Sequence, residues 1–128
     1  MTKAIKKLPD SELETMLAVW RAEAPVRGSE VAAALAASRG WNKSTVFTLL
    51  LRLVEKGFLS CEKEGKNNLY QPLVNEADYR AHESRSMLDR FYAGSLKNFV
   101  AAFCSEEPLS RSDLEELRQL VEEKAREL

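Results

Sequence analysis

Apolar residues near the start of the chain recur at the spacing of an α-helix. The segment "PDS" carries helix-start signals, and the apolar residues after it fall at i, i+3, i+4 and i+7. Pro25 then interrupts the pattern, because proline cannot continue a helix. We therefore expect a first helix that packs on a core through one face, formed by Leu13, Met16, Leu17 and Trp20.

A second, alanine-rich helix is predicted in "GSEVAAALAASRG", after a short extended piece. Gly28 and Ser29 supply its N-cap, and Gly40 stops it, since glycine readily adopts the left-handed conformation that ends helices. The helix packs through Val31 and Leu35, with alanines between them. We expect it to be short and small-faced.

The segment "GWNKSTVFTLLLRLVEKGF" predicts a third helix over residues 43 to 56, ended by Gly57. Asn42 is its N-cap, and Trp41 before the cap can pack on Val46 as a hydrophobic staple. Because so few residues around a glycine separate the second and third helices, the pair forms a helix-turn-helix. The core face of the third helix is expected to be Val46, Leu49, Leu50 and Leu53.

The other face of the third helix is polar without being strongly charged. Its N-terminal half offers hydroxyl, amide, cationic and aromatic groups, which can hydrogen-bond base edges and phosphates or touch a thymine methyl group. The free N–H groups of the helix N-terminus also favour a phosphate. For one helix alone, simple capping by small polar residues is the better interpretation. The candidates for DNA contact are Asn42, Lys43, Ser44, Thr45, Phe47, Thr48 and Arg52.

Two strands are predicted next, at residues 58–64 and 68–73, joined by "EGKNN", whose residues tolerate positive φ. Taken alone, this tip is an ordinary solvated turn. A helix-turn-helix followed directly by a basic hairpin is, however, the order of a winged helix-turn-helix, in which the hairpin is a wing that touches the DNA backbone. The predicted wing contacts are Lys63, Lys66, Asn67 and Asn68.

The rest of the chain is predicted to be helical. One long helix runs from Asn75 to about Ser105, Pro108 breaks it, and Ser110 or Ser112 caps a final helix. These helices carry more apolar surface than a hairpin of about 50 residues can bury on itself, although part of it can be intrachain core. We therefore expect a homodimer with its seam at Leu88, Phe91, Tyr92, Leu96, Phe99, Phe103, Leu114, Leu117 and Val121.

The predicted fold class is thus mainly α with a small β-hairpin wing, in two domains. Residues 1–75 form the winged helix-turn-helix and residues 76–128 a helical dimerisation domain. The net charge of −1 conceals an asymmetry, because residues 1–75 carry 11 Lys and Arg against 8 Asp and Glu, whereas residues 76–128 carry 8 against 12. A mildly basic first domain suits contact with phosphates, and double-stranded DNA is the predicted partner.

Composition disfavours several other classes of protein. Two distant cysteines, Cys61 and Cys104, and a single histidine, His82, are too few for a disulfide framework or a zinc site, so no metal or cofactor is expected. Residues for nucleophilic or acid–base catalysis do not form a recognisable constellation, so we do not expect an enzyme. Without an apolar run of about 18 residues or a signal peptide, the chain is expected in the cytoplasm, not inserted in a membrane.

Four segments together resemble the penicillinase and methicillin-resistance repressors of bacteria, the BlaI/MecI/CopY type. They are "LPDSELETMLAVW", "WNKSTVFTLLLRLVEKGFL", "LYQPLV" and "LSRSDLEELRQLVEE", which span nearly the whole chain. The resemblance implies a homodimeric transcriptional repressor that binds a dyad operator and controls β-lactamase, antibiotic-resistance or stress genes. It also implies a membrane sensor protease as a partner, whose signal leads to cleavage of the dimerisation domain.

Three features depart from the family pattern. Phe47 replaces an arginine of well-known members, and its ring either contacts a thymine methyl group or packs locally. The Asn-Phe cleavage bond of familiar members is matched in letters by Asn98-Phe99 but in register by Ala102-Phe103. A lone Cys104 does not supply the cysteine cluster of the copper-responsive branch. The alternative to a repressor is a winged helix that binds only proteins.

Overall fold

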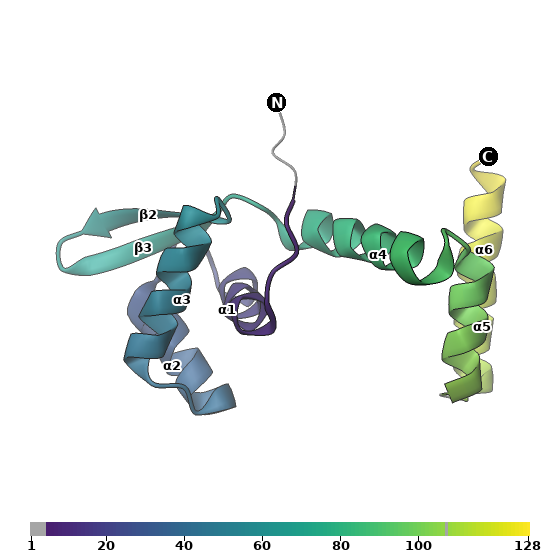
Figure 1. Ribbon diagram of the computed structural model, residues 1–128, viewed down its shortest axis with the longest axis horizontal. Coiled ribbons are helices and arrows are strands. Elements are labelled where there is room, and N and C mark those ends of the chain that lie inside the picture. The colour runs from purple at the N-terminus through teal and green to yellow at the C-terminus, as the bar shows by residue number, and fades with distance from the viewer. Residues whose placement is uncertain (1–4, 107) are drawn as a thin grey trace. The chain divides into compact units, whose positions relative to one another are not determined.

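The computed structural model describes residues 5–106 and 108–128. The chain is mainly helical with one small sheet, as the sequence predicts, and it divides into two compact units, one up to Ser84 and one from Arg85 onward (Figure 1). Its elements are α1 (Asp10–Arg21), β1 (Val26–Arg27), α2 (Gly28–Arg39), α3 (Lys43–Glu55), β2 (Leu59–Glu64), β3 (Asn67–Pro72), α4 (Glu76–Tyr92), α5 (Leu96–Glu106) and α6 (Arg111–Arg126).

The buried side of α1 overlaps only partly with the predicted face. Of the four apolar residues expected there, only Met16 is buried, whereas Leu13, Leu17 and Trp20 are half-buried. The buried residues keep the helical spacing but start one position earlier in the sequence. They are Glu12, Thr15, Met16 and Val19.

Two polar residues occupy this buried side because each has a partner. The carboxylate of Glu12 pairs with the ammonium group of Lys56 at the end of α3. The hydroxyl of Thr15 donates a hydrogen bond of 2.9 Å to the carbonyl oxygen of Ser11. A buried polar group is tolerated when it is hydrogen-bonded, and the apolar pattern of the sequence does not reveal such partners. The helix prediction was therefore right, while the predicted face was right only in part, since Leu13 and Trp20 pack against the core from half-buried positions.

The start of α2 is also corrected. Gly28 and Ser29, expected to cap the helix, are its first two residues, and Arg27 is the N-cap residue without a side-chain hydrogen bond. The end is confirmed, since Gly40 has φ +70° and donates its N–H to the carbonyl oxygens of the last turn. Val31 and Leu35 are buried as predicted.

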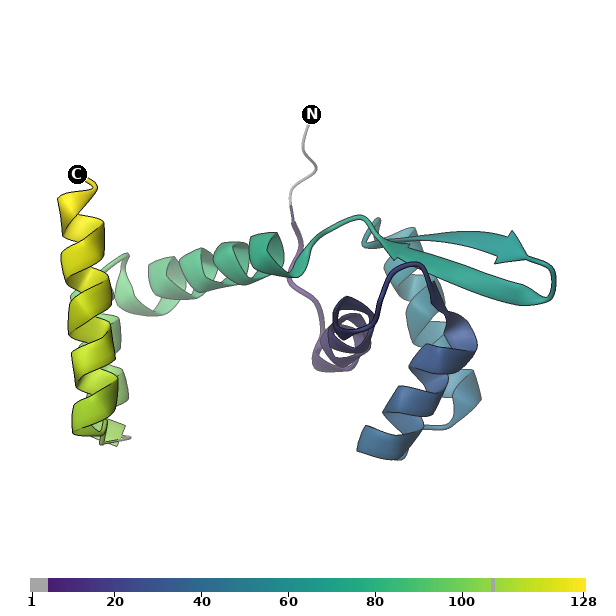
Figure 2. The same cartoon turned by 180° about the vertical axis from the view of Figure 1, so that it is seen from behind.

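The sheet has three antiparallel strands in the order β1, β3, β2. Its first strand, predicted only as an extended piece, joins the sheet by pairing Val26 with Tyr70. The turn of the hairpin is tighter than predicted, because Asn67 already belongs to β3 and lies opposite Glu64, with Gly65 at φ +64°. Views from both sides show the hairpin extending beyond α3 (Figure 1, Figure 2).

The core of the first unit includes the beginning of α4. Tyr79 is buried there, its hydroxyl accepts a hydrogen bond of 2.9 Å from the N–H of Leu8, and its ring lies 5.9 Å from that of Phe58. Burial raises the pKa of the Tyr79 hydroxyl above its usual value. The core is formed by Leu8, Met16, Val19, Val26, Val31, Ala32, Leu35, Val46, Leu50, Leu53, Phe58, Leu59, Tyr70 and Tyr79.

The helix that was expected from Asn75 to Ser105 is two helices. Between α4 and α5, Ala93 and Gly94 have φ values of +49° and +80°, and the N–H of Gly94 donates to the carbonyl oxygen of Leu88. Ser95 then accepts a hydrogen bond of 3.1 Å from the N–H of Asn98, as an N-cap does. A glycine stop followed by a serine start was therefore present in the sequence and was missed.

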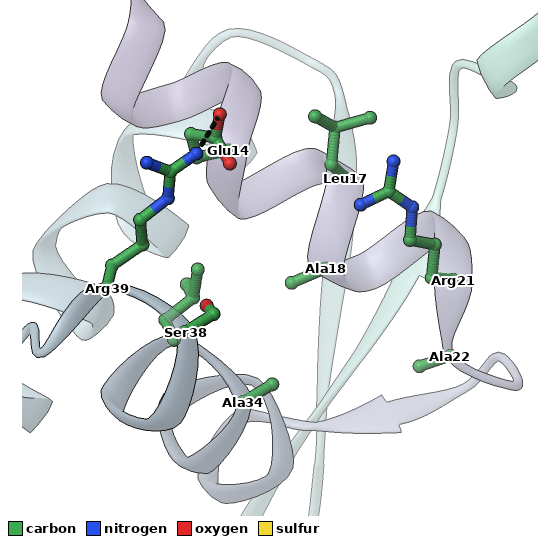
Figure 3. Close-up of a pocket in the computed structure, with 9 residues that line it drawn as sticks. Glu14, Leu17, Ala18, Arg21, Ala22, Ala34, Ser38 and Arg39 are labelled. Carbon is green, nitrogen blue, oxygen red and sulfur yellow. Dashed lines mark ion pairs between the residues drawn. The ribbon is translucent and has the colours of Figure 1, made fainter.

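An open groove of about 520 Å³ lies between α1 and α2. The alanines Ala18, Ala22 and Ala34 line it, and their short side chains leave it unfilled (Figure 3). At one end, Arg39 and Glu14 join the two helices by an ion pair of 2.7 Å. An exposed ion pair of this kind contributes up to about 1 kcal/mol to folding stability, so the two helices are held together mainly by their buried residues.

Candidate nucleic-acid interface

The N-terminus of α3 is fixed by its own polar side chains. The side-chain oxygen of Asn42 accepts hydrogen bonds from the Thr45 N–H at 2.9 Å and from the Ser44 hydroxyl at 2.8 Å, which confirms the predicted N-cap. The hydroxyl of Thr48 donates to the carbonyl oxygen of Ser44 at 3.0 Å. These bonds hold the first two turns of α3 and leave the side chains on the protein surface, since all four residues are exposed.

The two faces of α3 are divided as the sequence predicts. The four core residues, Val46, Leu49, Leu50 and Leu53, are all buried. On the outer side, Lys43 and Arg52 are exposed, and Leu51 keeps 57% of its surface accessible. The buried leucines fix α3 to the first unit, so its outer residues are presented on a rigid element.

Phe47 behaves differently from its neighbours on α3. It is half-buried and packs against the core of the first unit, with its ring against Gly28 of α2, while the ammonium group of Lys43 lies 5.9 Å from the ring centroid. Of the two roles considered for this ring, the structure shows local packing.

The hairpin sorts its side chains by face. Strand residues alternate between the two faces of a sheet, and residues paired across an antiparallel ladder share a face. Lys63 pairs with Asn68 and lies two residues from Cys61, which in turn pairs with the buried Tyr70. Lys63 and Asn68 therefore continue, towards the tip, the same face that packs on the helices through Tyr70.

The opposite face of the hairpin is acidic. Glu64 pairs with Asn67, and Glu62 lies two residues from Glu64, so these three residues share the other face. Of the four predicted wing contacts, the structure thus brings together Lys63 and Asn68, places Lys66 in the turn, and puts Asn67 on the far side. An anion that approaches the face of Lys63 and Asn68 is therefore close to an ammonium group and away from the two glutamates.

Sequence reasoning missed two groups that support this surface. Glu12, almost fully buried, holds the C-terminal end of α3 on α1 through Lys56. Gly28, at the start of α2, leaves the space that the rings of Phe47 and Tyr70 approach. The alternation of strand residues could have separated Asn67 from Lys63. Nothing in the local sequence indicates the contact between Phe47 and Gly28.

Burial also raises the pKa of the Tyr70 hydroxyl, and the neighbouring Cys61 thiol raises it further. Within the described ranges, 5–106 and 108–128, there is no group of three His, Cys, Asp or Glu side chains placed to hold a metal ion. In the same part of the chain, no helix has both the length and the apolar character needed to cross a membrane.

The second unit exposes most of its large apolar residues. No residue of α5 or α6, among those described, is buried. Phe91 is 72% exposed, Leu96 63% and Val121 59%, and Phe103 and Leu114 are about half exposed. The other expected seam residues, half-buried, are Leu88, Tyr92, Phe99 and Leu117.

Both candidate cleavage bonds lie inside α5. The Asn98-Phe99 bond is in its first turn and the Ala102-Phe103 bond one turn later. Phe99 contacts Tyr92 of α4, with ring centroids 5.5 Å apart, and Phe103, with centroids 6.5 Å apart. Each of the two bonds therefore directly precedes a phenylalanine of one aromatic cluster.

Comparison with known proteins agrees with this architecture. A model of the Penicillinase repressor family matches residues 8–123. The penicillinase repressor of Bacillus licheniformis is 38% identical over 121 residues, 94% of each chain. The methicillin resistance regulatory protein MecI of Mammaliicoccus sciuri is 29% identical over 118 residues, 92% of this chain and 95% of that protein.

Two solved structures are similar to the first unit. The solution structure of the DNA binding domain of the repressor BlaI is 37% identical, has a TM-score of 0.54, and matches 61% of this chain and 94% of its own. The Bacillus licheniformis BlaI monomeric form in complex with the blaP half-operator has the same identity and coverage and a TM-score of 0.52. The first unit is therefore a winged helix, and the chain belongs to the penicillinase repressor family of transcriptional repressors.

Proposed function

We propose that this chain is a homodimeric repressor that binds a dyad operator through its winged helix. The observation that carries the proposal is the division of α3 into four buried apolar residues and an exposed polar side. A solved relative, the BlaI monomeric form, is in complex with a half-operator, which supports the same role for this domain. The alternative, a winged helix that binds only proteins, has no comparable support.

In the proposed complex, α3 enters the major groove. Lys43, Ser44, Thr45 and Thr48 lie on the exposed N-terminal half of the helix, where hydroxyl and ammonium groups can reach base edges or phosphates. Arg52, one turn further, is placed for a phosphate at the edge of the groove. Asn42 contributes by holding the helix start, since its side-chain oxygen is already used by α3.

The wing is proposed to contact the adjacent DNA backbone through one face. Lys63 and Asn68 continue the face that packs on the helices, and exposed Lys66 lies at the tip. Glu62 and Glu64 lie on the opposite face, so they do not repel the phosphates at close range. Asn67 shares that face and is proposed to be the weakest of the four wing contacts.

The second unit is proposed to form the dimer. Its helices expose large aromatic and aliphatic side chains, and removing such apolar surface from water is favourable. In the proposal, a second copy of this chain supplies the matching surface. A dimer also binds two half-sites with a high effective concentration, which raises operator affinity beyond that of one winged helix. The dimer seam is proposed to lie at the nine residues predicted for it from the sequence, from Leu88 to Val121.

Regulation is proposed to act on this second unit. The relatives are named for penicillinase and methicillin resistance, so we propose β-lactam-response genes as targets. Cleavage at Asn98-Phe99 or Ala102-Phe103, triggered by a membrane sensor protease, would cut α5 and separate the aromatic cluster around Phe99. The chain itself acts by binding, without a catalytic step.

The test is a titration of the full chain against labelled duplexes, read by fluorescence anisotropy. One duplex carries a dyad from the DNA upstream of the chain's own coding region, and the other carries the same bases in random order. We expect the dyad to bind at least about a thousandfold more tightly, with affinity that falls steeply as salt increases. Equal affinity for both duplexes, or an affinity insensitive to salt, would refute the proposal.

A further inference from the structure

We infer that Phe47 positions the recognition helix against the wing and does not read a base. The inference rests on the proposed binding of an operator through α3. Its basis is a three-way contact at Gly28, where the ring of Phe47 from α3 and the ring of Tyr70 from β3 meet the first residue of α2. The helix-turn-helix and the strand that leads to the wing therefore pack against each other at Gly28.

The contact depends on the absence of a side chain at position 28. A Cβ atom built on Gly28 would lie 2.6 Å from Cε1 of Phe47 and 3.1 Å from Cε2 of Tyr70. The first distance is far inside van der Waals contact, so alanine here requires the Phe47 ring to move. Gly28 is the first residue of a right-handed helix, so glycine is needed there for space.

The neighbours of Gly28 connect it to the wing. Val26, two residues earlier, pairs with Tyr70 in the sheet, and Tyr70 pairs on its other side with Cys61 of β2. A displaced Phe47 ring therefore presses either on the strand that carries the wing or on α3 itself. Interiors are close-packed, so such a displacement shifts the elements around it.

Phe47 also acts on a predicted DNA contact. Lys43 lies one helical turn before it, with its ammonium group 5.9 Å from the ring centroid. A cation near an aromatic ring is weakly attracted to it, and the ring therefore narrows the positions that the lysine takes. Moving the ring alters both the direction of Lys43 and the placement of the wing.

Gly28 allows these two roles of Phe47 to be separated. Gly28 is buried, so the change Gly28→Ala adds no group that can touch DNA. If Phe47 is a positioning residue, this change disturbs operator binding through the ring alone. If Phe47 reads a base through its exposed edge, Phe47→Leu instead changes the preference at one base pair, and the double variant does not regain operator affinity.

The experiment compares Gly28→Ala, Phe47→Leu, the double variant and the matched control Ser29→Ala in the full chain. Ser29 is exposed and next in α2, so its change leaves the contact at Gly28 intact. Affinity is measured for the operator dyad, for random duplex, and for operators changed one base pair at a time. Thermal unfolding of each variant establishes that it is folded.

We expect Gly28→Ala to weaken operator binding about tenfold and random-duplex binding less than about twofold. In the double variant, the smaller side chain introduced by Phe47→Leu is expected to restore most of this loss, because it leaves room for the added methyl group. Strictly additive effects of the two changes, or a Phe47→Leu effect confined to one base pair, would overturn the inference.

The unfolding temperatures give a second test, because coupling between positions 28 and 47 is measurable without DNA. We expect the double variant to unfold at a higher temperature than the summed shifts in unfolding temperature of the two single variants predict. Additive shifts would contradict the contact. If the unchanged protein does not prefer the operator over random duplex, the proposed function fails. The coupling of unfolding temperatures still tests whether Gly28 and Phe47 are in contact.

Discussion

The ammonium group of Lys56, at the end of α3, is paired with the carboxylate of Glu12, which keeps only 3% of its surface accessible. The pair joins the first helix to the helix proposed to read DNA. Removing the carboxylate leaves an ammonium group beside a buried site, so we expect Glu12→Gln to destabilise the fold by about 1–3 kcal/mol. Urea unfolding followed by circular dichroism measures this.

Glu14 provides the matched control, because it lies on α1 like Glu12 but is more exposed. Its carboxylate forms an ion pair of 2.7 Å with Arg39 of α2. Glu14→Gln is expected to cost less than about 1 kcal/mol. Equal losses for the two variants would mean that burial of Glu12 adds nothing to its pair.

Tyr79 is predicted to anchor the beginning of α4 partly through the hydrogen bond that its hydroxyl accepts from the N–H of Leu8. Tyr79→Phe removes the acceptor of the Leu8 N–H and leaves that buried group without a partner, at a cost of about 1–3 kcal/mol. Urea unfolding measures the loss, and Tyr92→Phe, a half-buried tyrosine of the second unit, is the control. Hydrogen exchange at Leu8 should accelerate in Tyr79→Phe alone; an unchanged rate would contradict the anchoring role.

Alkaline stability is predicted to depend on the two buried tyrosines. Burial raises the pKa of Tyr70 and Tyr79 above the ordinary value of 10.0. The folded state therefore keeps these protons when the unfolded state loses them, and the resulting stability is complete below about pH 10 and lost as the pH rises above it. Unfolding free energies between about pH 9 and about pH 11 should fall less steeply in Tyr70→Phe than in the unchanged protein. Parallel curves would contradict the prediction.

The face assignment of the wing predicts unequal effects from neighbouring asparagines and lysines. Lys63→Ala and Lys66→Ala are each expected to weaken binding to all duplexes similarly and to reduce the salt slope by about one unit, because each removes one phosphate contact. Asn68→Ala is expected to weaken binding more than Asn67→Ala, since Asn67 shares the far face with Glu64. Titrations at several salt concentrations test this, and a larger loss at Asn67 would reverse the assignment.

Dimerisation is predicted to fail when a charge enters the aromatic cluster of α5. Phe99→Glu would bury an unpaired carboxylate, so sedimentation should find monomers, and operator affinity should fall by about a hundredfold or more while half-site binding remains. Lys97→Glu, an exposed position two residues earlier, is the control and should leave the dimer intact. A persistent Phe99→Glu dimer would place the seam elsewhere.

How far the sequence predicts this molecule depends on the range of each interaction. The core face of α3 follows from the spacing of Val46, Leu49, Leu50 and Leu53, and the Asn42 cap from a signal three residues long, so both were predicted correctly. The buried face of α1 was predicted only in part, because Glu12 is satisfied by Lys56, a residue far along the chain. Local pattern does not contain that partner.

The remaining errors have different causes. The break between α4 and α5 was encoded locally by Gly94 and Ser95, but a continuous apolar pattern across it favoured one helix. The packing of Phe47 was beyond the sequence, because it depends on a missing side chain at Gly28 in another helix. Residues that fit both a core and a surface role are settled only by tertiary contacts.

Alternation along β2 determines which charged side chains lie on the face proposed to contact DNA. Leu59 fixes which face of the strand is buried, and every second residue after it, including Lys63, lies on that face. Loss of one residue between them would bring Glu64 to the position of Lys63 and exchange attraction for repulsion without altering the composition of the tip. The number of residues between Leu59 and the tip therefore determines the charge of this face as strictly as their identity does.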